Sequence, residues 1–193
     1  MSARRVLAAP QTLPRTLGLA RLGVRLERDG ENEPRLARAL EELGGVEDHP
    51  VRERADAWLE AANLWRRLGD DERAWQGASE AARLVPEDAE AQILASYLAY
   101  RRPEAASRDD ARKVAERLER VFDRLDPDQF DLAGFLLAEA LDQVGPEGAG
   151  LERLLSLHER LGPTPLVAVG IAERLAKGPT PRAALEHFDV ALR

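Results

Sequence analysis

Three histidines, His49, His158 and His187, are the side chains of this 193-residue chain that could most readily bind a metal or transfer a proton. A zinc or iron site needs three or four convergent ligands. The histidines lie far apart in the sequence, and we identify no set of further ligands beside any of them. We therefore predict that they face solvent or lie at helix ends, and that the protein holds no metal and no other cofactor.

Adjacent acidic residues are the second candidate for chemistry, as a general acid and a general base. Two such pairs of carboxylates are Glu41-Glu42 and Asp109-Asp110. Neighbouring residues of a helix point in different directions, so a solvated face explains these pairs better. The sequence contains no cysteine and no G-x-S-x-G, phosphate-loop or H-E-x-x-H motif. We predict that the protein is not an enzyme.

Three tryptophans, Trp58, Trp65 and Trp75, fall within one short stretch and could line an aromatic ligand site. Trp58 and Trp65 are seven residues apart, which is the spacing of one helix face. Large aromatic side chains on such a face usually fill a core. We interpret the three tryptophans as packing residues of one repeating unit.

Helix-breaking residues recur at regular intervals and mark the elements that position these side chains. Prolines at positions 14, 50, 86, 127 and 163 are separated by 36, 36, 41 and 36 residues. A second series lies midway between them: Gly30, Gly69, Pro103, Gly145 and Gly178. Because proline and glycine end or redirect helices, each interval predicts a helical hairpin of two segments of about 12 to 19 residues.

The segments between the breakers have helical periodicity. Apolar residues spaced by three and four occur at Trp58, Ala61, Ala62 and Trp65 and again at Ala74, Ala78, Ala81 and Ala82. Helix starts are predicted at Thr164-Pro165, at Thr180-Pro181 and at Ser107 with Asp110. No segment alternates like a strand, and no apolar run is long enough to cross a membrane. The sequence therefore predicts an all-α fold.

The stretch from Ala55 to Asp88 resembles a tetratricopeptide (TPR) repeat over its full 34 residues. The matching residues are Ala55, Ala57, Trp58, Asn63, Gly69, Asp70, Ala74, Ala81, Leu84 and Pro86. The next unit begins similarly but has Pro103-Glu104 where the family has Gly-Asp, and the other three units fit by period alone. The resemblance implies an α-solenoid of about five stacked hairpins, at about 16–49, 50–86, 87–127, 128–163 and 164–193.

The resemblance also implies a concave groove, lined by the fifth, ninth and twelfth positions of each repeat. The fifth positions are Ala20, Leu59, Ile93, Phe135 and Val169, the ninth are Val24, Asn63, Tyr97, Glu139 and Glu173, and the twelfth are Glu27, Arg66, Tyr100, Asp142 and Ala176. An exposed apolar stripe with polar edges suits an amphipathic helix or an extended peptide. An equally weighted alternative is that these residues pack between hairpins.

Eight groove residues are our candidate contacts for a protein partner: Leu59, Asn63, Arg66, Ile93, Tyr97, Tyr100, Phe135 and Glu139. TPR proteins that hold a C-terminal carboxylate use lysine and asparagine at the fifth and ninth positions of one repeat. Here Leu59 stands in place of that lysine, which argues against such a ligand. The predicted function is a protein-interaction scaffold.

Self-assembly through the solenoid ends is the alternative function. The last segment carries Ala184, Leu185, Phe188, Ala191 and Leu192, an apolar stripe too wide for one contact. Solenoids normally cover such an end with a polar capping helix. We therefore expect a second copy, a partner or a further segment to cover this end, with Phe188 and Leu192 as the contacts of a homo-oligomer.

Charge and composition restrict the class of partner and the cellular compartment that we expect. With 44% hydrophobic and 33% charged residues the chain is expected to be folded and soluble, and its net charge of -7 disfavours nucleic acid. Residues 1–15 carry three arginines and no acid, and their apolar run stops at Pro10, too early for a secretion signal. We expect a mobile cytoplasmic tail before a single solenoid domain at 16–193. Abundant arginine with two lysines is typical of high-G+C bacterial genomes.

Overall fold

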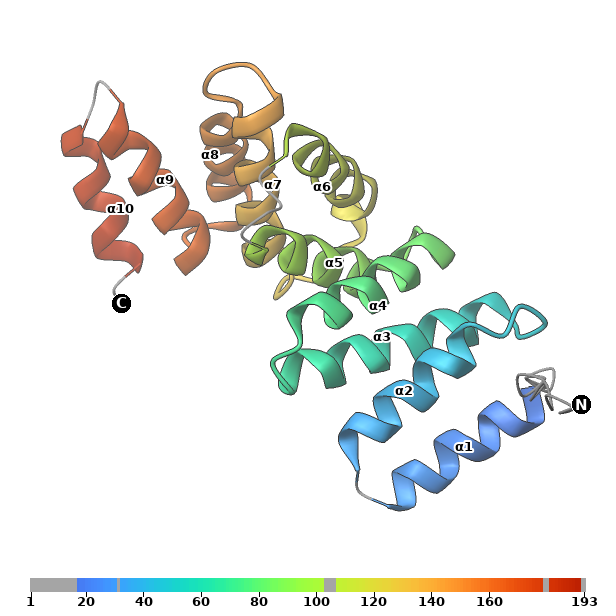
Figure 1. Cartoon of the computed structure of the whole chain (residues 1–193). Helices are drawn as coiled ribbons and strands as arrows, with labels where there is room; N and C mark the ends of the chain where they lie inside the picture. The colour runs from blue at the N-terminus through green and yellow to red at the C-terminus, as the bar shows by residue number, and fades with distance from the viewer. Residues whose placement is uncertain (1–16, 31, 103–106, 179–180, 192–193) are drawn as a thin grey trace, which may run out of the picture.

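Pairs of antiparallel helices stacked one on the next make up the computed structural model, which describes residues 17–30, 32–102, 107–178 and 181–191 (Figure 1). These residues form ten α-helices and two 3-10 turns: α1 Leu17–Asp29, α2 Glu33–Gly44, α3 Val51–Arg67, α4 Asp71–Leu84, α5 Ala89–Arg101, α6 Arg108–Val121, η1 Phe122–Arg124, α7 Phe130–Val144, α8 Ala149–Leu161, α9 Pro165–Lys177, η2 Pro181–Ala183 and α10 Ala184–Ala191. The predicted all-α solenoid of helical hairpins is confirmed.

Small residues set the close packing inside the second hairpin. Ala74 and Ala81 of α4 have no exposed surface and belong to the core cluster that includes α3. A Cβ on Gly77 would lie 3.1 Å from the carbonyl oxygen of Trp58 and 3.2 Å from the Cβ of Ala62. The two helices therefore approach as closely as the alanine-rich TPR pattern predicts.

The hairpin turns and helix starts follow the sequence signals. Gly69 has a φ of 80°, a left-handed conformation that glycine adopts without strain, and it turns α3 into α4. Asp70 and Asp88 begin α4 and α5 by accepting hydrogen bonds from the backbone N–H three residues later. Ser107 does the same for α6, as predicted, whereas Pro103 and Thr180 lie outside the described residues.

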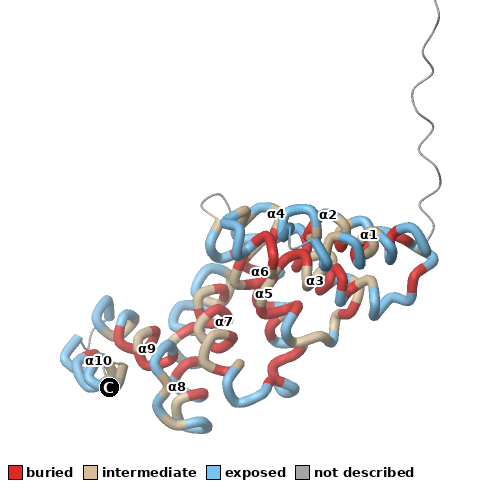
Figure 2. The backbone as a smooth tube through the Cα atoms, turned by 90° about the horizontal axis from the view of Figure 1, so that it is seen from below, coloured by how far each residue is buried: buried red, intermediate tan, exposed pale blue. Residues whose placement is uncertain are grey.

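The core runs along the solenoid as a series of linked clusters and not as one central mass. Buried residues occupy the seams between successive helices, and exposed residues cover the outside (Figure 2). One cluster joins α1 to α5, a second joins α5 to α8, and a third joins α7, α8 and α9. Each hairpin therefore depends on its neighbours for burial.

Candidate partner-binding groove

The first helices of the second, third and fourth hairpins border the predicted groove. A cavity of about 440 Å³ lies between α3, α5 and the start of α7, and we call it the groove cavity. Its lining residues are Asn63, Arg66, Glu90, Ile93, Leu94, Tyr97, Asp128, Gln129 and Leu132. Four of the eight predicted contacts, Asn63, Arg66, Ile93 and Tyr97, thus meet in one place.

Leu59 belongs to a second cavity that adjoins the first. This cavity measures about 450 Å³ and also contains Asn63 and Glu90, so the two cavities share a border. Leu59 itself is partly buried and packs against the core cluster of the first hairpins. The groove therefore extends along α3 and the beginning of α5.

Four of the polar side chains around the groove cavity have no hydrogen-bond or ion-pair partner among the described residues. The carboxylates of Glu90 and Asp128 and the guanidinium of Arg66 form no ion pair there, and the amide of Asn63 forms no side-chain hydrogen bond. By contrast, the hydroxyl of Tyr97 accepts a hydrogen bond from Arg101 at 3.0 Å. An apolar floor with unpaired charges at its edge is suited to binding a peptide.

Tyr100, Phe135 and Glu139 lie apart from the groove cavity. The rings of Tyr100 and Phe135 meet edge to face with centroids 6.2 Å apart, and Tyr100 is 50% exposed. Tyr100 and Glu139 line a small cavity of about 150 Å³ between α5, α6 and α7. Burial and the carboxylates of Glu139 and Glu173 raise the pKa of Tyr100 above its ordinary value.

The expected exposed apolar stripe at the fifth repeat positions is wrong. Ala20 and Ile93 are buried, and Leu59, Phe135 and Val169 are partly buried. Ile93 packs into the cluster that joins α5 to α8. At these positions the alternative of packing between hairpins describes the structure better, because successive hairpins stack closely.

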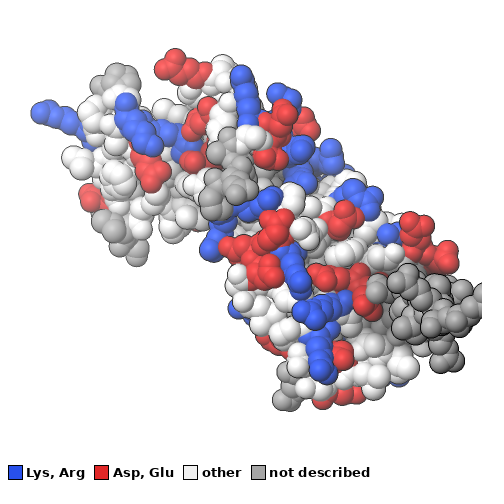
Figure 3. Space-filling view, in the orientation of Figure 1, with Lys and Arg blue, Asp and Glu red and all other residues white. Residues whose placement is uncertain are grey.

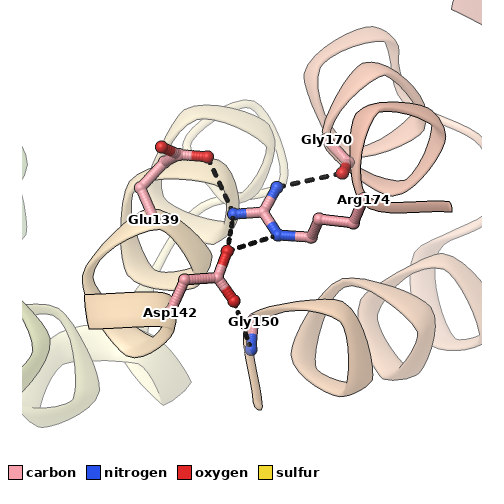
Figure 4. Close-up of polar contacts among 5 residues, drawn as sticks. All are labelled: Glu139, Asp142, Gly150, Gly170 and Arg174. Atoms are coloured by element: carbon pink, nitrogen blue, oxygen red, sulfur yellow. Dashed lines mark hydrogen bonds and ion pairs between the residues drawn. The ribbon is translucent and has the colours of Figure 1, made fainter. Parts of the chain in front are cut away.

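Glu139 is held by an ion pair across two hairpins. Arg174 of α9 donates from Nη2 to Glu139 and from Nε to Asp142, both at 2.7 Å, and from Nη1 to the carbonyl oxygen of Gly170 at 2.9 Å (Figure 4). Asp142 in turn accepts a hydrogen bond from the backbone N–H of Gly150. This cluster, the Arg174 network, fixes the fifth hairpin to the fourth and engages the side chain that the sequence assigned to the groove.

A second contact between hairpins replaces a predicted helix cap. Thr164 precedes Pro165 at the start of α9, but its side chain makes no capping bond. Instead Asp131 of α7 accepts hydrogen bonds from the backbone N–H groups of Leu166 and Val167 at 3.2 and 2.9 Å and from the Thr164 hydroxyl at 2.6 Å. The cap of α9 therefore comes from the preceding hairpin.

Asp131→Ala should lower the free energy of unfolding by about 1–2 kcal/mol, because it leaves the first N–H groups of α9 without an acceptor. Urea denaturation followed by circular dichroism measures this loss. Asp48→Ala is the control, since Asp48 is exposed and its side chain forms no hydrogen bond or ion pair in the described part of the chain. Equal stability of the two variants would contradict the capping role.

The histidines are less exposed than a solvent-facing prediction implies, although His49 precedes α3 and His158 lies in the last turn of α8, at helix ends as predicted. His49 is 3% exposed, and its ring lies 3.4 Å from the carboxylate of Glu53. His158 of α8 and His187 of α10 meet edge to face with centroids 5.4 Å apart. Burial, followed by the neighbouring His158, lowers the pKa of His187, which favours the neutral form of His187 in this contact. Within the described ranges no three His, Asp or Glu side chains are placed to hold a metal ion.

The three tryptophans contribute to packing, and Trp65 also forms a side-chain hydrogen bond. Trp65 is buried and donates from Nε1 to Glu41 at 2.6 Å. Trp58 and Trp75 are partly buried and line a cavity of about 820 Å³ between α2 and α4, away from the groove cavity. Arg102 covers the ring of Trp75 at 3.9 Å. These contacts agree with the interpretation of packing residues.

Five residues of the groove cavity were missed by sequence reasoning: Glu90, Leu94, Asp128, Gln129 and Leu132. Glu90 and Leu132 occupy the second position of their repeats, and Asp56 at the same position lines the adjoining cavity. The second position of the repeat therefore also lines the groove, and the repeat register could have identified these residues. Asp128 and Gln129 precede α7, where the repeat pattern has no fixed position.

Comparison with solved structures gives matches to MamA proteins across nine-tenths of the chain. A crystal structure of MamA protein has a TM-score of 0.65 and 14% sequence identity, covering 91% of this chain and 90% of that one. The structure titled MamA RS-1 ArsTM double mutant has a TM-score of 0.64 and 16% identity over 93% and 94%. MamA proteins are TPR-like helical repeat proteins. This chain shares their fold.

Comparison of the sequence with known proteins finds fewer relatives than comparison of the structure. No protein-family model and no curated protein matches the chain. Identities of 14 to 16% to MamA show a common architecture only. The resemblance at residues 55–88 and the MamA-like fold support the same repeat architecture independently.

In the described part of the chain, every helix is too short or too polar to span a membrane.

Proposed function

We propose that this chain is a non-catalytic scaffold that binds a peptide segment of a partner protein in its concave groove. The observation that carries the proposal is the groove cavity, in which an apolar floor meets unpaired polar groups. Acidic and basic side chains alternate over the face shown in Figure 3, so no extended field of one sign favours nucleic acid there. The TPR-like fold supports a binding role because stacked repeats present extended concave surfaces.

The lining residues define the chemistry of the expected peptide. Leu94 and Leu132 are partly buried and offer an apolar surface for one or two large side chains, with Ile93 buried beneath them. Glu90 and Asp128 favour a basic residue beside them, whereas Arg66 favours an acidic one or the peptide carbonyls. We propose an apolar anchor flanked by a basic residue as the central motif, in a helical or extended segment.

Selection of peptides from a displayed random library against the purified chain tests this proposal. Binders are expected to share the anchor and the basic flank, and Tyr97→Ala should weaken them at least about tenfold because it removes a wall of the cavity. Arg66→Glu should change which sequences are selected without changing the helical circular dichroism, since Arg66 is exposed.

Gln76→Ala is the matched control, because Gln76 lines the cavity between α2 and α4 and lies outside the groove. Its affinities should equal those of the unmodified chain. Peptides that bind Tyr97→Ala and the unmodified chain equally would place binding elsewhere and contradict the proposal.

A further inference from the structure

A cavity of about 270 Å³ between α4, the start of α5 and α6 is lined mainly by basic side chains, and we call it the basic cavity. α5 packs against both α4 and α6, so the three helices form one seam (Figure 1). The lining residues are Ala82, Arg83, Pro86, Gln92, Lys113, Glu116, Arg117 and Arg120. The basic cavity therefore gathers positive charge in a chain whose net charge is -7.

A buried glutamine forms the floor of the basic cavity and holds the end of α4. Gln92 is 1% exposed, and its Nε2 donates to the carbonyl oxygens of Ala82 at 2.8 Å and Pro86 at 3.2 Å. Both donors of the amide are thus used, while its Oε1 has no hydrogen-bond donor among the described residues. These bonds fix the α4–α5 seam without any ligand.

Arg117 is partly buried in this cavity and has no counter-ion. Its guanidinium forms no ion pair and no hydrogen bond in the described part of the chain. Burial lowers the pKa of Arg117 from its ordinary value, attraction from Asp110 offsets part of that effect, and repulsion from Arg120 adds to it. Arginine stays protonated in proteins, so the lowered pKa reflects a cation that has lost water without gaining a partner. The amide of Gln92 is uncharged and cannot balance it.

Helix dipoles explain two of the neighbouring cations but not Arg117. Arg83 and Arg120 lie in the last turns of α4 and α6, where a cation interacts favourably with the helix dipole. Arg83 is exposed and pairs with Glu80 at 2.8 Å. Arg117 lies before the last turn of α6 and is less exposed than either of them. Its position therefore calls for a separate explanation, which a bound anion would supply.

The unpaired charges that line the basic cavity sum to one positive charge. Arg83 and Lys113 each have an acidic partner on their own helix. Among the described residues Arg117 and Arg120 form no ion pair, and neither does Glu116. Two guanidiniums against one carboxylate leave a charge that one further carboxylate balances, whereas a phosphate of nearly two charges exceeds it. We propose that the basic cavity binds a carboxylate side chain from an acidic segment of a partner protein, with Arg117 as its main donor.

Acids around the rim favour a single side chain over an extended anionic surface. Glu80, Asp110 and Glu116 lie on the same two helices as the cations, within a few residues of them. They would repel the neighbouring phosphates of a membrane or a nucleic-acid strand. A peptide can instead place one carboxylate in the cavity and keep uncharged residues on either side.

The basic cavity is separate from the surfaces already described. It shares no lining residue with the groove cavity, whose expected peptide carries a basic flank. It is also separate from α10, the expected contact of a homo-oligomer, where Phe188 is 37% exposed and Leu192 lies outside the described residues. Binding of an acidic segment therefore does not rest on peptide binding in the groove.

Nuclear magnetic resonance of the 193-residue chain, titrated with a capped peptide of three Gly-Glu repeats, tests the proposal. The amides at the end of α6 and the side-chain amide of Gln92 should shift, with a Kd on the order of 1 mM or below for so small a contact. A peptide of three Gly-Gln repeats should shift none of them. General attraction is excluded as a cause of binding, because a chain of net charge -7 repels an acidic peptide.

Arg117→Met should weaken binding of the Gly-Glu peptide at least about tenfold, because it removes the charged donor and keeps the apolar stem. Arg112→Met is the matched control, since it makes the same change of charge on the same helix at an exposed residue outside the cavity. It should leave the affinity unaltered. Glu116→Gln should strengthen binding about twofold, because it removes a competing carboxylate. Arg120→Met changes an exposed side chain and should weaken binding without affecting the fold.

Thermal melting adds a readout that does not depend on the peptide. Arg117→Met should melt at the same temperature as the unmodified chain or above it, because it removes a cation that nothing balances. A lower melting temperature would mean that the guanidinium has a partner within the folded chain, and would overturn the proposal. Equal weakening by Arg112→Met and Arg117→Met would overturn it as well. So would inorganic phosphate or phosphatidylglycerol vesicles that shift these amides while the Gly-Glu peptide does not.

Discussion

Replacing Gly150 by alanine is expected to destabilise the protein by about 1–3 kcal/mol. Gly150 lies in the first turn of α8, where the helix approaches α7. An added Cβ would stand 2.5 Å from the carbonyl oxygen of Ala138 and 2.2 Å from the Oδ1 of Asp142. The carbonyl belongs to the backbone of α7 and cannot turn aside, so α7 and α8 must separate and weaken the Arg174 network.

Gly23→Ala is the matched control for this substitution. Gly23 is also helical, but a Cβ there would meet nothing within 4 Å. Alanine should therefore stabilise α1 by up to about 1 kcal/mol, through its higher helix propensity. Urea denaturation followed by circular dichroism measures both changes. Effects of the same sign would show that the close approach of α7 and α8 does not determine the loss at Gly150.

Much of the fold could be predicted because the repeat pattern acts locally. The spacing of breakers and the small residues at Ala74 and Ala81 concern neighbouring helices, and one hairpin largely defines their environment. Gly69 likewise determines its own turn through its backbone conformation. The all-α solenoid follows from these short-range signals.

The candidate site could be predicted only in part because the groove depends on how hairpins stack. Asn63, Arg66 and Tyr97 fall on the groove cavity as the repeat positions imply. Ile93 has the right position but is buried, since the stacking of α5 to α8 closes over it. Glu139 is engaged by Arg174, 35 residues later, and no local pattern predicts that pairing.

Contacts between hairpins also explain the other differences between the sequence predictions and the structure. Thr164 has the sequence of a helix cap, yet Asp131 from the preceding hairpin caps α9 because its carboxylate accepts two backbone hydrogen bonds at once. His158 and His187 appear isolated in the sequence and meet only because α10 folds back near α8. Reading one repeat at a time cannot reveal a partner that lies in another repeat.

Arg174→Met should lower the free energy of unfolding by about 2–3 kcal/mol. The Arg174 side chain is 11% exposed, and it faces the carboxylates of Glu139 and Asp142, which are 26% and 38% exposed. Methionine fills a similar space but leaves two partly hydrated carboxylates facing each other without a cation. Their partial exposure places the loss below the roughly 3–5 kcal/mol of a fully buried pair. Urea denaturation measures the change.

Arg67→Met is the control that isolates burial, because Arg67 also joins two helices by an ion pair, to Glu33 at 2.9 Å, but at 55% and 47% exposure. Water solvates both of these groups, so the loss should stay within about 0.5 kcal/mol. Adding Asp142→Asn to Arg174→Met should recover part of the stability, since it removes the repulsion that the first substitution exposes. If the double variant is no more stable than Arg174→Met, the two carboxylates do not repel and the network stabilises the fourth and fifth hairpins through packing of the arginine stem alone.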